Sequence, residues 1–164
     1  MSFAGPCVGC GDGSAPTYLP PKPALSLNAP KDHPVQPKGK AEADEYRAAI
    51  APYVEKGRLT YPAAKKRHLD ELPAGYAFFA VTNLRGGMGT TEQVFIAVAS
   101  VKDGRITGRI ASDILKVKGF KDGDPCVFPE SELVDWVITH PDSTEEGNVV
   151  GKFLDGWQKT RPRK

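Results

Sequence analysis

One hairpin constrains the fold of this chain more than any other feature of its sequence. Over residues 93–101 the side chains alternate between two faces, as they do in a β-strand. One face carries Val94, Ile96 and Val98, and the other carries Phe95, Ala97, Ala99 and Val101. Asp103 and Gly104 follow, a pair favoured in two-residue hairpin loops because both positions take a positive φ. Residues 105–110 return as the partner strand, so the pattern predicts an antiparallel sheet.

Short strands separated by turns continue on both sides of this hairpin. We expect strands at residues 76–81, 115–117, 126–128, 134–138 and 149–153. Glycine-rich turns at residues 86–89 and 121–124 and a helical turn at residues 129–132 connect them. Successive short strands joined by tight turns indicate an antiparallel meander rather than alternating strand–helix–strand units.

Two helices are expected before the first strand. A stripe of apolar residues at spacings of three and four marks the first helix, from about residue 42. The stripe is Ala43, Tyr46, Ile50 and Val54. We expect Pro52 to kink or end this helix and Gly57 to stop it. A second helix is expected from Thr60, with Pro62 in its first turn and its end before Pro73.

Together these elements predict an α+β fold, in which two N-terminal helices pack on a strongly bent antiparallel sheet or a small half-open barrel. We expect the sheet to bend around one core, with the face of Val94, Ile96 and Val98 turned inward and the helices closing one side. Residues 41–164 then form a single domain, a size that one hydrophobic core can support.

Prolines set the first 40 residues apart from this domain. Eight of the 15 prolines lie there, and the stretch has few large apolar side chains. Proline fixes φ and lacks a backbone N–H, so residues 18–23 (Tyr-Leu-Pro-Pro-Lys-Pro) should be extended and polyproline-like, unable to join a β-ladder. We interpret residues 1–40 as a mostly disordered leader or linker. The alternative is a proline-rich ligand for an aromatic groove.

Charge follows the same division. The net charge of +2 belongs to residues 1–40, because residues 41–164 carry 18 basic and 18 acidic side chains. A domain without net charge has no overall field to attract nucleic acid, so we expect no nucleic-acid partner. No apolar run reaches the roughly 18 residues that a transmembrane helix needs. The sequence therefore predicts a cytoplasmic protein without a transmembrane segment.

Three segments resemble a known family. Residues 101–110 (Val-Lys-Asp-Gly-Arg-Ile-Thr-Gly-Arg-Ile) and 117–124 (Val-Lys-Gly-Phe-Lys-Asp-Gly-Asp) combine a strand, an Asp-Gly hairpin and a Gly-Asp turn, and residues 132–136 end in an Asp-Trp pair. In order and spacing they are similar to domain of unknown function 2314, a bacterial family that includes YegJ-like proteins. The resemblance covers about residues 58–156. It implies a small bacterial α+β domain and supplies no catalytic residues.

Cysteines near the N-terminus leave three alternatives. Cys7 and Cys10 have the spacing of half a zinc knuckle, but a closed site needs four ligands and no second Cys-x-x-Cys follows. The pair also lacks the strand and helix of a thioredoxin-like site. Cys10 would suit lipoprotein processing, and the protein would then be a periplasmic lipoprotein if the N-terminus as given is truncated before Cys10. We expect no metal and no cofactor, with Cys7 and Cys10 as weak metal candidates.

Catalytic residues are not evident. Cys126, His140 and Asp142 could form a nucleophile, base and orienting acid, but Cys126 lies in an expected strand, where burial as a small apolar side chain is usual. An enzyme of unidentified reaction is kept as the alternative function. Its site would lie near Asp113, Asp124, Asp135 and His140.

A partner-binding face is the preferred interpretation. The loop at residues 85–91 lacks the lysine of a phosphate-binding loop, but it offers Arg85 as a planar cation and Met88 as an adaptable apolar tip. Trp157 follows the last expected strand and could stand beside this loop as an aromatic anchor, whereas Trp136 suits the core. The sequence therefore favours a non-enzymatic protein-binding or accessory module, such as an immunity protein, with Arg85, Met88 and Trp157 in the contact face.

Overall fold

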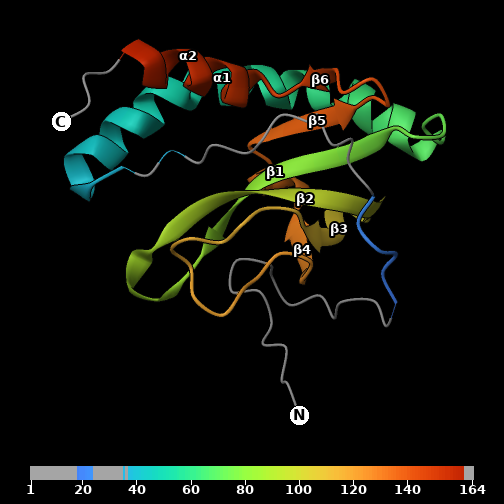
Figure 1. Ribbon diagram of the computed structural model, residues 1–164, viewed down its shortest axis with the longest axis horizontal. Helices are drawn as coiled ribbons and strands as arrows, with labels where there is room; N and C mark the ends of the chain where they lie inside the picture. The colour runs from blue at the N-terminus through green and yellow to red at the C-terminus, as the bar shows by residue number, and fades with distance from the viewer. Residues whose placement is uncertain (1–17, 24–34, 36, 161–164) are drawn as a thin grey trace.

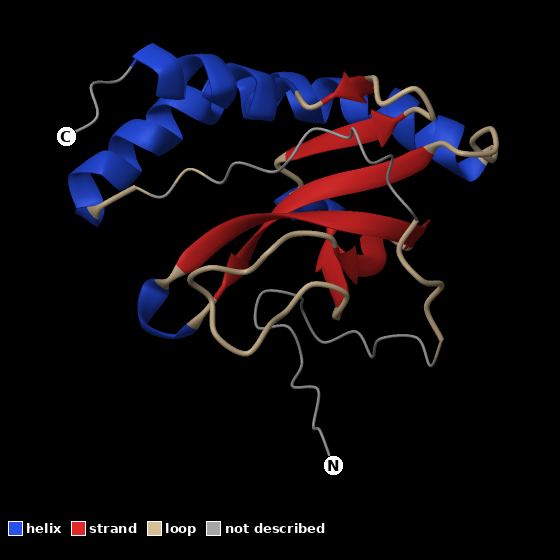
Figure 2. Ribbon diagram, in the orientation of Figure 1, coloured by secondary structure: helices blue, strands red, loops and turns tan. Residues whose placement is uncertain are grey.

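A six-stranded antiparallel sheet and two helices make up the fold (Figures 1 and 2). The computed structural model describes residues 18–23, 35 and 37–160. The helices are α1 (Gly39–Leu69) and α2 (Val149–Thr160). The strands are β1 (Ala77–Arg85), β2 (Thr91–Lys102), β3 (Arg105–Ile110), β4 (Pro125–Pro129), β5 (Asp135–Thr139) and β6 (Glu145–Gly147). The α+β class is confirmed, and one helix is C-terminal rather than both N-terminal.

The sheet is open, with strand order β4-β3-β2-β1-β5-β6. The expected hairpin is present between β2 and β3, where Asp103 and Gly104 take φ values of 51° and 71°. A bulge interrupts the β2–β3 register between Val98 and Ser100, and bulges bend a strand and increase its twist. The helical turn is also present, as the 3₁₀ turn Glu130–Glu132.

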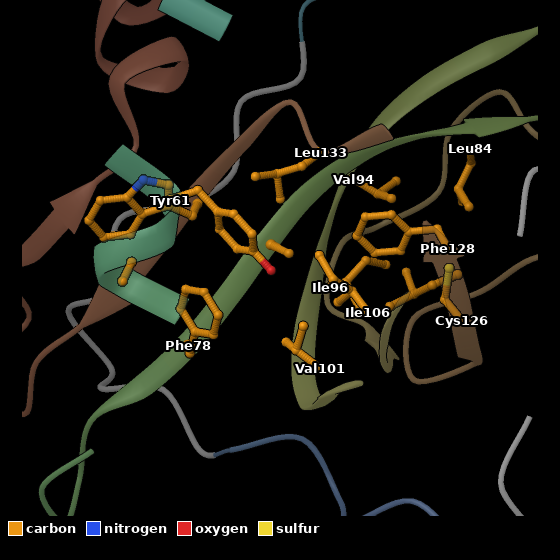
Figure 3. Packing of buried hydrophobic residues seen from close by; sticks show 14 of the residues in the cluster. Tyr61, Phe78, Leu84, Val94, Ile96, Val101, Ile106, Cys126, Phe128 and Leu133 are labelled. Carbon is orange, nitrogen blue, oxygen red and sulfur yellow. The ribbon is translucent and has the colours of Figure 1, made fainter. Parts of the chain in front are cut away.

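Side chains on the two faces of the sheet enter two separate clusters. One cluster lies on the face of Val94 and Ile96 (Figure 3) and includes Phe78, Leu84, Ile106, Phe128 and Leu133. The other contains Phe79, Val81, Ala97 and Val137 of the sheet, together with Ile50 of α1 and Val150 and Leu154 of α2. The expectation of one core is therefore wrong. Most of the helical contact lies on the face opposite Val94, because β1, β2 and β5 carry apolar residues on both sides.

Helix α1 is one continuous helix, not the expected pair. Pro52 and Pro62 both lie inside it, although an interior proline costs on the order of 3 kcal/mol. Buried residues occur on both sides of Pro52 and Pro62, and this packing outweighs the local preference to break. These buried residues are Ile50, Gly57, Tyr61 and Ala64. Gly57 is therefore a packing position rather than a helix stop.

Residues 149–153 are helical, which corrects the expected last strand. Val150, Phe153, Leu154 and Trp157 all contact the second cluster and are spaced three and four residues apart, as on one face of a helix. Residues 115–117 also form no strand, because their backbone N–H groups donate to the carboxylate of Glu92 instead of to a neighbouring strand.

Candidate functional site

The four residues of the enzymatic alternative lie on separate parts of the fold. Asp135 begins β5, and His140 follows its end, so the length of the strand separates them. Asp124 lies beside β4, at the opposite edge of the sheet order, and its carboxylate accepts a hydrogen bond from Lys121 N. Asp113 is exposed in the loop after β3. The structure does not bring these four groups to one reacting centre.

Asp135 is buried and holds the N-terminus of α2. It is 0% exposed, and its Oδ2 accepts a hydrogen bond from Val150 N at 2.8 Å, while Oδ1 accepts one from Trp136 N at 2.8 Å. Burial raises the pKa of this carboxyl to about 6, and the backbone donors oppose that rise. Gly57 of α1 lies against the same carboxylate, since a Cβ there would be 2.7 Å from Oδ1. Asp135 therefore joins β5, α1 and α2.

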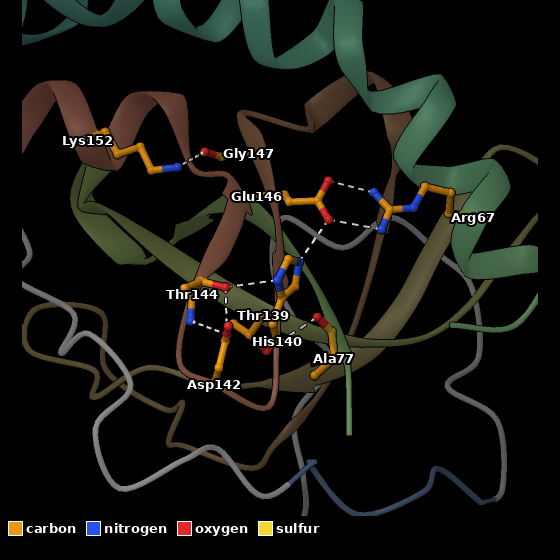
Figure 4. A network of polar contacts seen from close by, with 9 residues as sticks. All are labelled: Arg67, Ala77, Thr139, His140, Asp142, Thr144, Glu146, Gly147 and Lys152. Carbon is orange, nitrogen blue, oxygen red and sulfur yellow. Dashed lines mark hydrogen bonds and ion pairs between the residues drawn. The ribbon is translucent and has the colours of Figure 1, made fainter. Parts of the chain in front are cut away.

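His140 belongs to a polar network on the surface beside the β5–β6 turn (Figure 4). Its Nε2 lies 2.8 Å from Glu146, whose carboxylate also accepts two hydrogen bonds from Arg67 of α1. These hydrogen bonds, first that from Arg67, lower the pKa of Glu146 to about 2. On the other side of the ring, Nδ1 lies 2.9 Å from Thr144 Oγ1.

Thr144 is not arranged as a nucleophile. Its hydroxyl donates to Asp142 Oδ1 at 2.6 Å, a shorter contact than the 2.9 Å to the imidazole. The Thr144 backbone N–H also donates to Asp142, and the hydrogen bonds from Thr144 lower the pKa of that exposed carboxyl. The hydroxyl proton is thus directed to Asp142 rather than to the imidazole of His140. The network closes the turn and ties it to α1.

The β1–β2 connection projects Met88 into solvent. Met88 is 106% exposed, and its φ of 56° is left-handed, a conformation that a non-glycine side chain adopts at a cost of about 1–2 kcal/mol. The loop is held by hydrogen bonds from Gly86 N to Thr90 O and from the Thr90 hydroxyl to Gly87 O, both at 2.8 Å. An ordered loop therefore presents a large apolar side chain that contributes nothing to the core.

Leu115 is a second exposed apolar side chain at this end of the sheet. It is 57% exposed, and its backbone N–H donates to Glu92 Oε1 at 2.7 Å. Glu92 also accepts hydrogen bonds from Lys116 N and Val117 N, and Val117 packs against the backbone of Gly86. The loop after β3 is thereby fixed beside the β1–β2 connection. We call Arg85, Met88 and Leu115 the tip surface; sequence reasoning missed Leu115 because it assigned that residue to a strand.

Arg85 lies at the base of the tip surface, next to a shallow pocket of about 180 Å³. The pocket is lined by Arg58, Thr82, Asn83, Arg85, Ser131, Glu132 and Val134. Arg85 Nη2 is 3.7 Å from Glu132 Oε1, and Arg58 Nε donates to Leu133 O at 2.7 Å. Pockets that enclose small molecules usually measure about 300–1,000 Å³. The hollow beside Arg85 is smaller than this range.

Trp157 lies on α2 and is half-buried. Its ring centroid is 6.2 Å from the rings of both Tyr46 and Phe153. Tyr46 in turn donates a hydrogen bond to Gln93 near the start of β2. Trp157 is therefore connected to the end of the sheet that carries the tip surface, but through side chains of the second cluster.

The cysteines divide between described and undescribed parts of the chain. Cys7 and Cys10 lie outside the described residues. Cys126 is 1% exposed and lies in the first cluster, as expected from the sequence. Within residues 18–23 and 37–160, no three His, Cys, Asp or Glu side chains are grouped so that they could hold a metal ion.

Comparison with known families assigns the domain. A family model described as an uncharacterized protein conserved in bacteria (DUF2314) matches residues 64–161. The chain belongs to this family. The DUF2314 region starts in the second half of α1 and includes all six strands, Asp135 and the tip surface. No curated protein and no solved structure matches the chain significantly. In the described part of the chain, neither helix is long and apolar enough to span a membrane.

Proposed function

We propose that this DUF2314 domain is a protein-binding module and that the tip surface is its contact site. The supporting observation is Met88, which is fully exposed in a left-handed conformation on a hydrogen-bonded loop. Glycine, asparagine or aspartate adopts this conformation at lower cost than methionine, and strained residues cluster at functional positions, so the methionine at this exposed tip supports a role beyond closing the turn. Methionine is also an adaptable contact residue, because it is unbranched and polarizable.

The surroundings of Met88 define the chemistry of the partner. Leu115 extends the apolar area, while Arg85, with a 59% exposed side chain, adds a planar cation at the base of the loop. A matching partner surface would offer an apolar pocket for Met88 and a carboxylate that competes with Glu132 for Arg85. An accessory or immunity-like role would act through this kind of contact, with Trp157 as a secondary contact at the same end of the molecule.

Site-specific cross-linking tests this proposal. A photo-reactive amino acid is placed at Met88 in the full chain and irradiated in the native host, with Leu69 as the matched position. Leu69 is also an exposed apolar residue (56%), but it lies at the end of α1, on the other side of the molecule (Figure 1). We expect a discrete adduct with one protein from position 88 and none from position 69. Equal adducts from both positions, or none from position 88, would contradict the proposal.

A further inference from the structure

Residues 18–23 lie on the domain as an extended segment, and Arg109 of β3 holds their backbone. Arg109 Nη2 donates to Leu19 O at 2.9 Å, and Nε donates to Pro20 O at 2.8 Å. The remaining Nη1 donates to Gly123 O at 3.0 Å. One guanidinium thus binds two successive carbonyls of the segment and one carbonyl of the domain.

Two side chains of the segment face the domain, three residues apart. Leu19 is 6% exposed, and Lys22 forms an ion pair with Asp122. Pro20, Pro21 and Pro23 point to solvent and are exposed. A polyproline II helix has three residues per turn, so a Leu-Pro-Pro-Lys sequence places its leucine and lysine on the same side. These contacts therefore favour a peptide with leucine and lysine three residues apart, rather than any peptide with a positive charge.

The domain side of this contact is built by the turn before β4. Lys121 N donates to Asp124 Oδ2 at 2.9 Å, and Gly123 N donates to Ile110 O at 2.8 Å. These bonds fix Asp122 and Gly123 beside Arg109. We call Arg109, Asp122 and Gly123 the Arg109 platform. Its donors are aimed at the carbonyls of an extended chain, and recognition of proline-rich peptides uses such preformed, low-entropy ligands.

We propose that the Arg109 platform is a binding site for extended peptides with a Leu-Pro-Pro-Lys pattern, and that residues 18–23 occupy it as a tethered ligand. A second peptide of this pattern must displace the chain's own segment. Tethering gives the internal segment an effective concentration on the order of millimolar, which weakens a competing peptide without changing the platform. This inference does not depend on the tip surface.

The test uses a fluorescent peptide of residues 18–23 and the full chain. The variant Leu19→Asp/Lys22→Glu removes both side-chain contacts of the tethered segment, and fluorescence anisotropy measures binding. We expect the peptide to bind this variant with an apparent affinity at least tenfold higher than for the wild type. Adding Arg109→Lys should abolish binding, because lysine keeps the charge but lacks the planar fork of N–H donors with which Arg109 reaches both carbonyls of the peptide.

Charge reversal provides a second, milder test on exposed side chains. Lys22→Glu should open the platform to the wild-type peptide. Lys22→Glu/Asp122→Lys should close it again by restoring an internal ion pair, tested with a peptide that carries Lys22→Glu and so matches the altered platform. A peptide with Leu19 replaced by Asp should bind no variant. The proposal is overturned if the peptide binds wild type and opened variants equally, if binding survives Arg109→Lys, or if millimolar peptide binds none of the opened variants.

Discussion

Two kinds of acidic site occupy different regions of this protein. Glu92 and Asp135 are buried, and their carboxylates accept hydrogen bonds from backbone N–H groups. Glu146 and Asp142 lie at the surface and pair with the side chains of Arg67, His140 and Thr144. The buried pair positions a loop and a helix, whereas the surface pair closes one turn. Each of these four carboxylates therefore has a structural partner on the domain itself.

Of the buried carboxylates, Glu92 should have the largest effect on the free energy of unfolding when it is replaced. Removing the carboxylate by Glu92→Ala leaves the N–H groups of Leu115, Lys116 and Val117 without their acceptor. We expect a loss of about 3–4 kcal/mol in the free energy of unfolding, measured by urea denaturation. Glu92→Gln, which keeps one acceptor oxygen, should lose about half as much. An unchanged stability in Glu92→Ala would show that water replaces the carboxylate.

Ionisation of Asp135 should make the free energy of unfolding depend on pH, by an amount similar to or smaller than the effect of Glu92→Ala. Its folded pKa of about 6 lies above the unfolded value of 3.8, so the folded state binds more protons between these values. Stability should therefore fall as pH rises from 4 to 6, by on the order of 2–3 kcal/mol from this group, and level off above 6. The difference between wild type and Asp135→Asn over this range isolates the contribution. If the difference in stability between wild type and Asp135→Asn does not change with pH, the raised pKa of Asp135 is contradicted.

Two helical glycines test the contact of α1 with Asp135. A Cβ at Gly57 would lie 2.7 Å from Asp135 Oδ1 and 3.2 Å from Val134 O, so Gly57→Ala should destabilise by about 1–3 kcal/mol. Gly156 of α2 is the matched control, because a Cβ there meets nothing within 4 Å. Gly156→Ala should stabilise by about 0.5–1 kcal/mol through helix propensity. The same sign for both substitutions would disprove close packing at Gly57.

Replacing a surface carboxylate should have the smallest effect on stability. Glu146→Gln weakens the pairing with Arg67 and His140, yet exposed ion pairs contribute about 0–1 kcal/mol. The stability contribution of Glu146 changes with pH in the direction opposite to that of Asp135. Because the pKa of Glu146 is lowered from 4.5 to about 2, its contribution is present above pH 4.5 and is lost as pH falls toward 2. Thermal melts of wild type and Glu146→Gln at pH 7 and pH 3 measure the loss of stability and its dependence on pH. If Glu146→Gln destabilises the protein at pH 7 as much as Glu92→Ala does, the surface and buried carboxylates do not differ in their contribution to stability.

Local patterns in the sequence predicted the parts of the fold that depend on neighbours in the chain. The alternation of residues 93–101 and the Asp103-Gly104 pair predicted the central hairpin. Helix α1 could not be predicted as one element, since the packing that carries it through Pro52 and Pro62 involves distant strands. The stripe of Val150, Phe153, Leu154 and Trp157 was visible in the sequence, but the β-branched pair at its start favoured a strand.

The candidate site was predictable only in part, for the same reason. Arg85 and Met88 were identified from a glycine-rich loop between strands, which is a local signal. Leu115 lies beside them because Glu92 accepts hydrogen bonds from the backbone of Leu115 and Val117, which follow it in the sequence by 23 and 25 positions. Such a contact leaves no periodic pattern. The contact of Arg109 with Leu19, 90 residues apart, is equally invisible in the sequence.

Binding through the tip surface is tested most directly by affinity. The partner captured at position 88 is titrated calorimetrically against wild type, Met88→Lys and Leu69→Lys, with the melting temperature of each variant recorded. We expect Met88→Lys to weaken binding at least tenfold, about 1.4 kcal/mol, while its melting temperature and the affinity of Leu69→Lys stay as in wild type. Wild-type affinity in Met88→Lys would contradict a contact site at the tip surface.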